Sequence, residues 1–176
     1  MAKDTVKEQG LEMSCLPFLA EGRVVKGFGR GSKQLGIPTA NFTQDVVDTM
    51  PTDMIEGVYY GLANVDGGSV SRMVMSVGHN LHFANAMRTM ETHILRSFAD
   101  DFYGGLLRVM VLGFIREMES YTSLDALIAA IHSDIDIANK ALSEERFASC
   151  YDSDFFKHGF AVVTNGRAVQ SDGTSS

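Results

Sequence analysis

The sequence predicts a mainly β protein, an antiparallel sheet or small barrel that carries a C-terminal helix. In its first two thirds, short runs rich in β-branched, aromatic and Met residues are separated by turn residues. In its last third, apolar residues recur at spacings of three and four. Strands do not alternate with helices, so the pattern favours antiparallel pairing over a parallel sheet.

Two neighbouring runs predict a hairpin. Residues 57–65 (GVYYGLANV) and 72–78 (RMVMSVG) flank the turn composition Asp-Gly-Gly-Ser at 66–69. A shorter run at 23–26 predicts a strand ahead of a glycine-rich segment. The hairpin strands should therefore pair antiparallel.

Two later runs predict further strands. Residues 89–95 (TMETHIL) alternate, which puts Glu91 and His93 on one face and the residues between them on the other. Residues 106–115 (LLRVMVLGFI) could be a strand or a buried helix by periodicity alone, but their flanking glycines and their Val, Ile and Phe content favour a strand.

The C-terminal third predicts an amphipathic helix. Thr122 and Asp125 resemble the start of a capping box, and Ser123 is an alternative cap. Residues 144–149 suggest a last turn or a short second helix. The apolar stripe consists of Leu124, Leu127, Ile128, Ile131, Ile135 and Ala138.

Length and composition predict one folded unit. The chain has 176 residues, of which 45% are hydrophobic and 21% charged, enough for a single core. We expect a flexible arm at 1–15, a folded domain at 16–160 and a flexible tail at 161–176. A net charge of -7 argues against nucleic acid or an anionic membrane as partner. Two cysteines and no apolar leader predict a cytoplasmic protein.

Residues 22–42 (GRVVKGFGRGSKQLGIPTANF) are the most informative segment. Their glycines let backbone N–H groups point into a concavity, and Lys26, Arg30 and Lys33 add positive charge. Such a loop suits phosphate, although it matches neither common nucleotide-binding glycine motif. The alternative is a hairpin loop with solvated basic residues.

Two oxygen donors follow this loop. Pro38 favours an extended segment, in which Thr39 and Asn41 present a hydroxyl and an amide oxygen on the same side. Together they could complete the coordination of a Mg²⁺ held mainly by phosphates. They could equally satisfy turn backbone.

Glu91 and Arg116 are candidates for chemistry further along the chain. Glu91 with His93 could be a general base with an orienting partner, or a solvent-side cross-strand pair. Arg116 begins a polar loop that could cover a site as a flap, or it could end a strand.

Together, several segments resemble the riboflavin kinase (flavokinase) family of the eukaryotic, stand-alone type. They are residues 22–42, GVYYG at 57–61, METHIL at 90–95, DDFYG at 100–104 and SLDALIAAIHSDIDIA at 123–138. The resemblance implies a six-stranded antiparallel Greek-key barrel with a C-terminal helix, acting as a monomer. It also implies the reaction of riboflavin and ATP to FMN and ADP with Mg²⁺.

The resemblance also implies roles for residues of the ATP half of the site. Gly27 and Lys33 would contact ATP, and Thr39 and Asn41 would contact both ATP phosphate and the metal. Glu91 would be the catalytic base that takes the proton from the 5'-hydroxyl of the ribityl chain.

For the flavin, the resemblance suggests Ile94, Arg96 and Arg116. The chain departs from the family pattern at His79, at Arg96 and in the loop 116–121 (REMESY), where the family commonly has Arg-Pro-Glu and a basic residue. The alternative function is a flavin- or nucleotide-binding barrel without turnover, and the altered loop is the feature that favours it.

Overall fold

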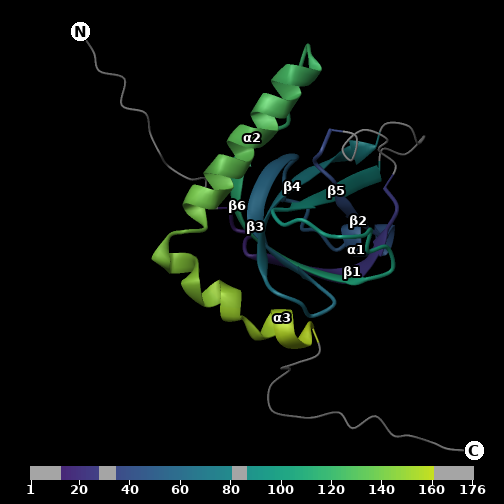
Figure 1. The fold of residues 1–176 in the computed structure, drawn as a ribbon, viewed down its shortest axis with the longest axis vertical. Helices are drawn as coiled ribbons and strands as arrows, with labels where there is room; N and C mark the ends of the chain where they lie inside the picture. Colours follow the sequence, from purple (N-terminus) through teal and green to yellow (C-terminus); the bar gives the residue numbers. More distant parts are fainter. Residues whose placement is uncertain (1–12, 28–34, 81–86, 161–176) are drawn as a thin grey trace, which may run out of the picture.

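The computed structural model describes residues 13–27, 35–80 and 87–160. Within them, six strands pair antiparallel in a closed barrel, in the order β1-β2-β5-β4-β3-β6 (Figure 1). The strands are β1 (Phe18–Val25), β2 (Ala40–Phe42), β3 (Gly57–Val65), β4 (Ser71–Asn80), β5 (Met87–Ile94) and β6 (Leu106–Arg116). The helices are α1 (Gln44–Val47), α2 (Leu124–Ala141), the 3-10 helix η1 (Glu145–Asp152) and α3 (Asp154–His158). The predicted barrel with a C-terminal helix is confirmed.

The connectivity brings β2 beside β5. Strands β3, β4 and β5 form a meander, and β2 pairs with β5 instead of with its sequence neighbour β3. The predicted hairpin between β3 and β4 is confirmed. Its turn contains Asp66 and Gly67 at φ 50° and 70°, the left-handed region that Asp and Gly tolerate best.

Some predicted boundaries differ from the observed ones. The first strand begins at Phe18 and not at residue 23, because Phe18 and Ala20 fill the barrel core while the strand pairs with β6. Of the two possible helix caps, Ser123 is the one used, since its side chain accepts a hydrogen bond from the Ala126 N–H. Helix α1 was not predicted.

The arms expected at 1–15 and 161–176 lie almost wholly outside the described residues, as do Arg30 and Lys33. All strands and helices of the described residues lie between residues 16 and 160, and the domain limits themselves stay a prediction.

The barrel interior is apolar and rich in methionine. Met54, Met73, Met75 and Met90 are all 1% exposed or less, and they pack with aromatic and β-branched residues. Flexible thioethers fill irregular gaps well, which suits a small and strongly curved barrel.

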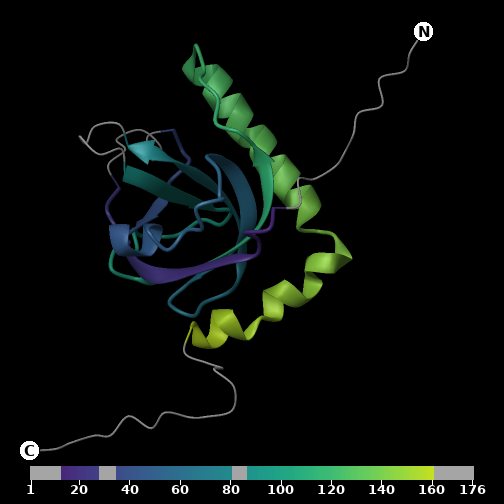
Figure 2. The ribbon, with the colours of Figure 1, turned by 180° about the vertical axis from the view of Figure 1, so that it is seen from behind.

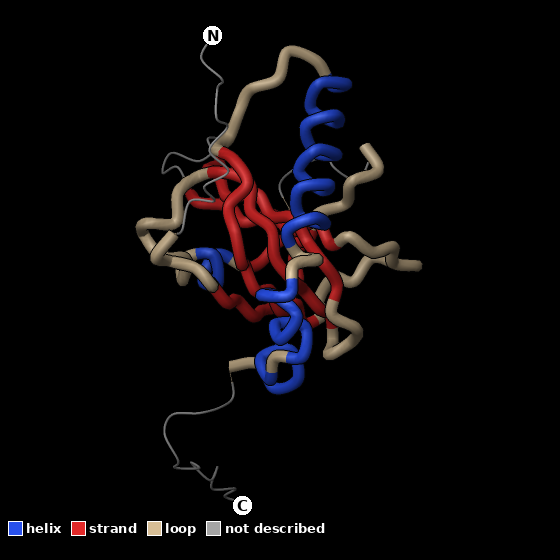
Figure 3. The backbone as a smooth tube through the Cα atoms, turned by 90° about the vertical axis from the view of Figure 1, so that its left-hand side faces the viewer, coloured by secondary structure: helices blue, strands red, loops and turns tan. Residues whose placement is uncertain are grey.

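A second apolar layer lies outside the barrel. Helix α2 packs against β3, β4 and β6, with η1 and α3 continuing along the same side (Figures 2 and 3). At the C-terminal end of α2, Arg72 of β4 donates hydrogen bonds to the Asn139 carbonyl, Ser143 and Tyr151. The N-terminal turns of α2 extend beyond the barrel (Figures 1 and 2), and Leu124 there is 54% exposed.

Candidate active site

Glu91 lies on the outer face of β5. Its neighbours Met90 and Thr92, together with Ile94, point inward and are buried, so the predicted alternation is confirmed. Glu91 itself is half-buried. A carboxylate therefore stands on the outside of the barrel wall, within reach of a bound molecule.

β2 and the residue just before it place two side-chain oxygens beside this carboxylate. Asn41 is the direct register partner of Glu91, so their side chains project from the same face of adjacent strands. The Thr39 hydroxyl donates to Glu91 Oε2 at 3.2 Å. Three side chains that are up to 52 residues apart in sequence thus meet at one place.

Gly27, two residues after the end of β1, closes the same corner. A Cβ added at Gly27 would collide with the amide group of Asn41. A larger residue here would displace the Asn41 amide group, and Gly27 is therefore part of the cluster. Lys33, the other residue predicted to bind ATP, lies outside the described residues.

His93 shares the outer face of β5 with Glu91, as predicted, but its described partner is different. Its Nδ1 donates to the Pro38 carbonyl oxygen at 2.7 Å. Thr39, and not His93, is the observed hydrogen-bond partner of the Glu91 carboxylate in the described part of the chain. His93 instead fixes the backbone next to Thr39.

An outer row of residues continues from this corner across the sheet. Ser76 of β4 is the register partner of Glu91, and Val58 of β3 is the register partner of Ser76. We call Asn41, Glu91, Ser76 and Val58 the outer row. Strand β6 meets it at Arg116, which pairs with Val58. Three strand spacings separate Glu91 from Arg116, roughly 14 Å along the sheet.

A pocket of about 790 Å³ lies at the C-terminal end of β5, starting at His93, two residues beyond Glu91. It lies between the segment after the glycine-rich loop and the segment that follows β5, and Phe98 and Phe102 form a ring pair in its wall, 4.5 Å apart. Its lining includes Gly36, Pro38, His93, Ile94, Arg96 and Asp101.

Two of the three predicted flavin residues line this pocket. Arg96 is exposed, and its guanidinium lies 5.2 Å from the centre of the Phe98 ring. Ile94 is 6% exposed and packs mainly into the barrel core.

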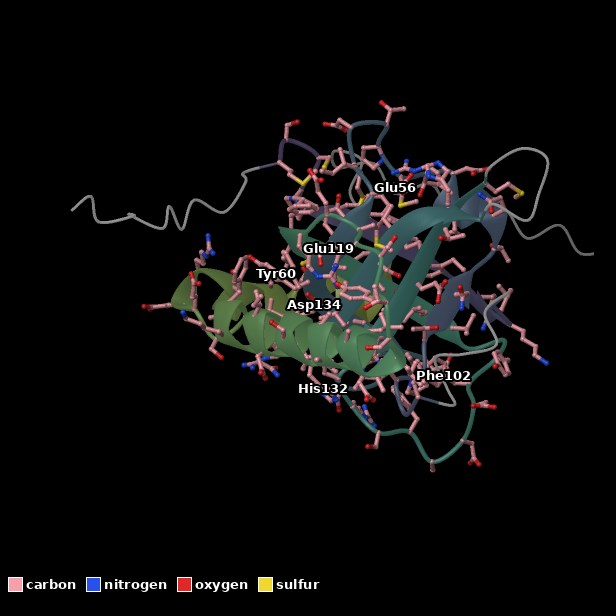
Figure 4. The ribbon with its side chains drawn as sticks, turned by 90° about the horizontal axis from the view of Figure 1, so that it is seen from above. Glu56, Tyr60, Phe102, Glu119, His132 and Asp134 are labelled. Atoms are coloured by element: carbon pink, nitrogen blue, oxygen red, sulfur yellow. The ribbon has the colours of Figure 1, made fainter. Side chains whose placement is uncertain are left out.

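The third, Arg116, lies far from them at the end of β6. It forms a bidentate ion pair with Asp134 of α2, at 2.8 Å and 2.7 Å. The hydrogen bonds that the Arg116 guanidinium donates to the Asp134 carboxylate raise the pKa of Arg116 further. Asp134 is 3% exposed, so this acid is buried with its partner. Figure 4 shows the pocket residue Phe102 well separated from Asp134 and Glu119.

The loop after Arg116 is mostly exposed and is anchored by one aromatic ring. Arg116 lies 5.7 Å from the ring centre of Tyr121, whose hydroxyl donates to Glu119 at 3.0 Å. Burial and, to a smaller extent, this hydrogen bond raise the pKa of Tyr121. His79, another departure from the family pattern, pairs with Glu56 at the end of β4.

Sequence reasoning missed Asp134 and Ser76. Asp134 interrupts the apolar stripe of α2 between Ile131 and Ile135, and an acid at such a position signals a buried partner. Ser76 lies in an otherwise apolar strand and acquires meaning only from its register with Glu91.

The described residues contain neither a membrane-spanning helix nor a metal-binding cluster of acidic, His and Cys side chains. No helix there is long and apolar enough to cross a membrane. No group of three or more His, Cys, Asp or Glu residues there could hold a metal ion by itself.

Comparisons with known proteins identify the family of the chain. The family model described as "Flavokinase: Riboflavin kinase" matches residues 15–142. The riboflavin kinase of Mus musculus is 47% identical over 154 residues, covering 88% of this chain and 99% of the mouse protein.

Two solved structures share the fold. The riboflavin kinase of Trypanosoma brucei matches with a TM-score of 0.67 and 29% identity, covering 84% of this chain and 93% of that one. A structure titled macrolide-efflux protein from Streptococcus pneumoniae matches with a TM-score of 0.59 and 30% identity, over 70% of this chain but 38% of that longer one. The family model, the mouse relative and the shared barrel confirm the predicted resemblance, and the chain belongs to the riboflavin kinase family.

Proposed function

We propose that this chain transfers the γ-phosphate of ATP to the 5'-hydroxyl of riboflavin, giving FMN and ADP, with Glu91 as the catalytic base. The observation that carries the proposal is the meeting of Gly27, Thr39, Asn41 and Glu91 on the outer face of one barrel corner, in a member of this family. Substrates can approach that corner from two sides, the pocket and the outer row.

The nucleotide belongs on the pocket side. Gly27 and Gly36, which lie on either side of the undescribed part of the glycine-rich loop, are at Asn41 and at the pocket wall respectively. The phosphates would then reach Thr39 and Asn41, with Lys33 as a further contact. A pocket of about 790 Å³ with an aromatic pair in its wall is large enough for a nucleotide base and sugar.

The flavin belongs on the side of the outer row. The row runs from Glu91 to the end of β6 at Arg116, and Leu127, Ile128 and Ile131 of α2 remain half-exposed. Such a surface suits an apolar planar ring with one polar edge. We therefore keep Arg116 as a flavin residue and reassign Ile94 and Arg96 to the nucleotide side, because they line the pocket.

The donor atoms at the corner fit Mg²⁺. Thr39 and Asn41 offer neutral oxygens beside one carboxylate, which are the hard ligands that this ion prefers. Protein groups alone are too few to hold it, so the phosphates of ATP would supply most of its ligands. When bound, Mg²⁺ would neutralise phosphate charge during transfer.

The chain's own groups position the reactants and move one proton. Glu91 would accept the proton of the 5'-hydroxyl while the hydroxyl oxygen attacks the γ-phosphorus and ADP leaves. Thr39 holds one carboxylate oxygen of Glu91 in the free protein and orients it at the junction of the two substrate sides. Because phosphoryl transfer passes through a loose transition state, alignment provides most of the rate enhancement.

A turnover assay with Glu91→Gln tests the proposal. Wild-type protein should convert riboflavin to FMN with ATP and Mg²⁺, measured by chromatography of the flavins. Glu91→Gln should lower kcat about 10²- to 10⁴-fold while riboflavin binding changes little, because the amide cannot accept the proton.

Glu145→Gln is the matched control, since Glu145 is an exposed carboxylate in η1, outside the corner. Near-normal turnover by Glu91→Gln would remove the base assignment. Flavin or ATP binding without any FMN from wild-type protein would favour the binding barrel instead. In that case the pairing of Arg116 with Asp134 would be the first candidate explanation for the missing turnover.

We further propose a cytoplasmic monomer that takes small molecules and neither nucleic acid nor membrane as partners. The net charge of -7 supports the exclusion of polyanionic partners. Cys15 and Cys150 are both free thiols, which suits a reducing compartment. Sedimentation of the purified chain and imaging of a tagged one test these points.

A further inference from the structure

We infer that Ser76 binds the ribityl chain of riboflavin and selects for flavins that carry it, an inference that rests on the proposed function. The residue comes from β4, a strand to which neither the motifs nor the family resemblance assigned a substrate contact. Ser76 is the direct register partner of Glu91, on the strand next to the proposed base and on the flavin side of it.

The Ser76 side chain faces outward with the base. Met75 and Val77 on either side are fully buried in the barrel, so alternation points Ser76 to the outer face. Opposed residues on antiparallel strands have Cβ atoms about 5 Å apart. A substrate hydroxyl that approaches Glu91 from the outer row would therefore come within reach of Ser76.

The Ser76 hydroxyl is available for a ligand. It is half-buried, and it makes no hydrogen bond to any other residue in the described ranges. The next residues on the outer face of β4 offer no polar side chain, because Val74 packs beneath α2 and Gly78 has no side chain. Ser76 is thus the polar group that β4 offers beside the base.

The chemistry of the site matches a polyol. A hydroxyl donates one hydrogen bond and accepts two, so it can pair with a sugar-alcohol hydroxyl in either direction. A site built to bond a substrate hydroxyl discriminates against an analogue that lacks it. Ser76 would hold the chain so that the terminal hydroxyl, and not an inner one, lies at Glu91.

The test compares two flavins that share the ring system. Riboflavin carries the ribityl chain and lumiflavin carries a methyl group in its place, and the binding of each to the full chain is followed by flavin fluorescence. Ser76→Ala should weaken riboflavin binding about 3- to 10-fold, the size of one net hydrogen bond, and leave lumiflavin binding within twofold. KM for ATP should stay unchanged, and Ser76→Thr should restore most of the riboflavin affinity.

Ser71→Ala is the matched control, because it removes a hydroxyl from the same strand at the end remote from Glu91. Equal weakening of both flavins by Ser76→Ala, as general damage to the fold would cause, overturns the inference. Unchanged riboflavin affinity overturns it as well. Absence of FMN from wild-type protein would instead defeat the proposed function, and the ratio of the two flavin affinities would still report on Ser76.

Discussion

Tyr59 is the residue whose burial makes the most direct prediction. Its ring is fully buried, its hydroxyl donates to the Ile55 carbonyl at 2.6 Å, and burial raises its pKa to about 12. The unfolded chain loses this proton near pH 10, while the folded chain keeps it. The free energy of unfolding should therefore fall as the pH rises from about 10 to about 12, by up to about 3 kcal/mol.

Urea titrations at pH 9 to 12 check this slope against Tyr59→Phe. In the variant, the free energy of unfolding should fall less steeply with pH, because one titrating proton is missing. This holds even if the variant differs from wild type in stability at pH 9. Tyr103→Phe, at a tyrosine that is 54% exposed, should keep the wild-type slope. Parallel curves for wild type and Tyr59→Phe would contradict the assignment.

At the scale of elements, the Arg116–Asp134 ion pair joins β6 to α2. Asp134 is nearly fully buried, so removal of its charge leaves the Arg116 guanidinium with a weaker partner in a poorly hydrated place. Asp134→Asn should lower the free energy of unfolding by about 1–3 kcal/mol, measured in urea. Asp136→Asn, an exposed acid on the same helix, should change it by less than about 0.5 kcal/mol. Equal effects of the two substitutions would show that the ion pair adds nothing.

The sequence could predict the faces of single strands in the site, but not which strands lie side by side. Period-two alternation is local, so it correctly placed Glu91 outside β5 and its neighbours inside. The contact between Thr39 and Glu91 depends on pairing between β2 and β5, which no local pattern encodes. Only the family resemblance brought these two residues together before the structure did.

The flavin residues could not be grouped from sequence for a related reason. Arg96 and Arg116 each end or follow a strand, and the closure of the barrel decides where those ends lie. The structure places Arg96 in the pocket that follows β5, and Arg116 across the sheet from Glu91. Asp134, in contrast, could have been found from the sequence, because it is an acid within the apolar stripe of a helix.

At the scale of the whole molecule, β2 is the weakest part of the ring. It has three residues and pairs at two positions with β1 and at two with β5, whereas β3 and β6 pair at eight. The backbone amides of β2 and their partners should exchange with deuterium faster than those of β3 and β6. Because Thr39 and Asn41 are the proposed contacts for ATP, Mg-ATP should slow exchange there most. Uniform exchange, or uniform slowing, measured by mass spectrometry would contradict this.

A short closing strand also bears on how the protein survives in a crowded solution. A complete ring offers no open strand edge to another chain, and separation of β2 would leave β1 and β5 as two such edges. Self-association would then start from this opened form, at a rate set by how often β2 separates from β1 and β5. A nucleotide bound at β2 would hold the ring closed, and the protein would aggregate most readily when ATP is scarce.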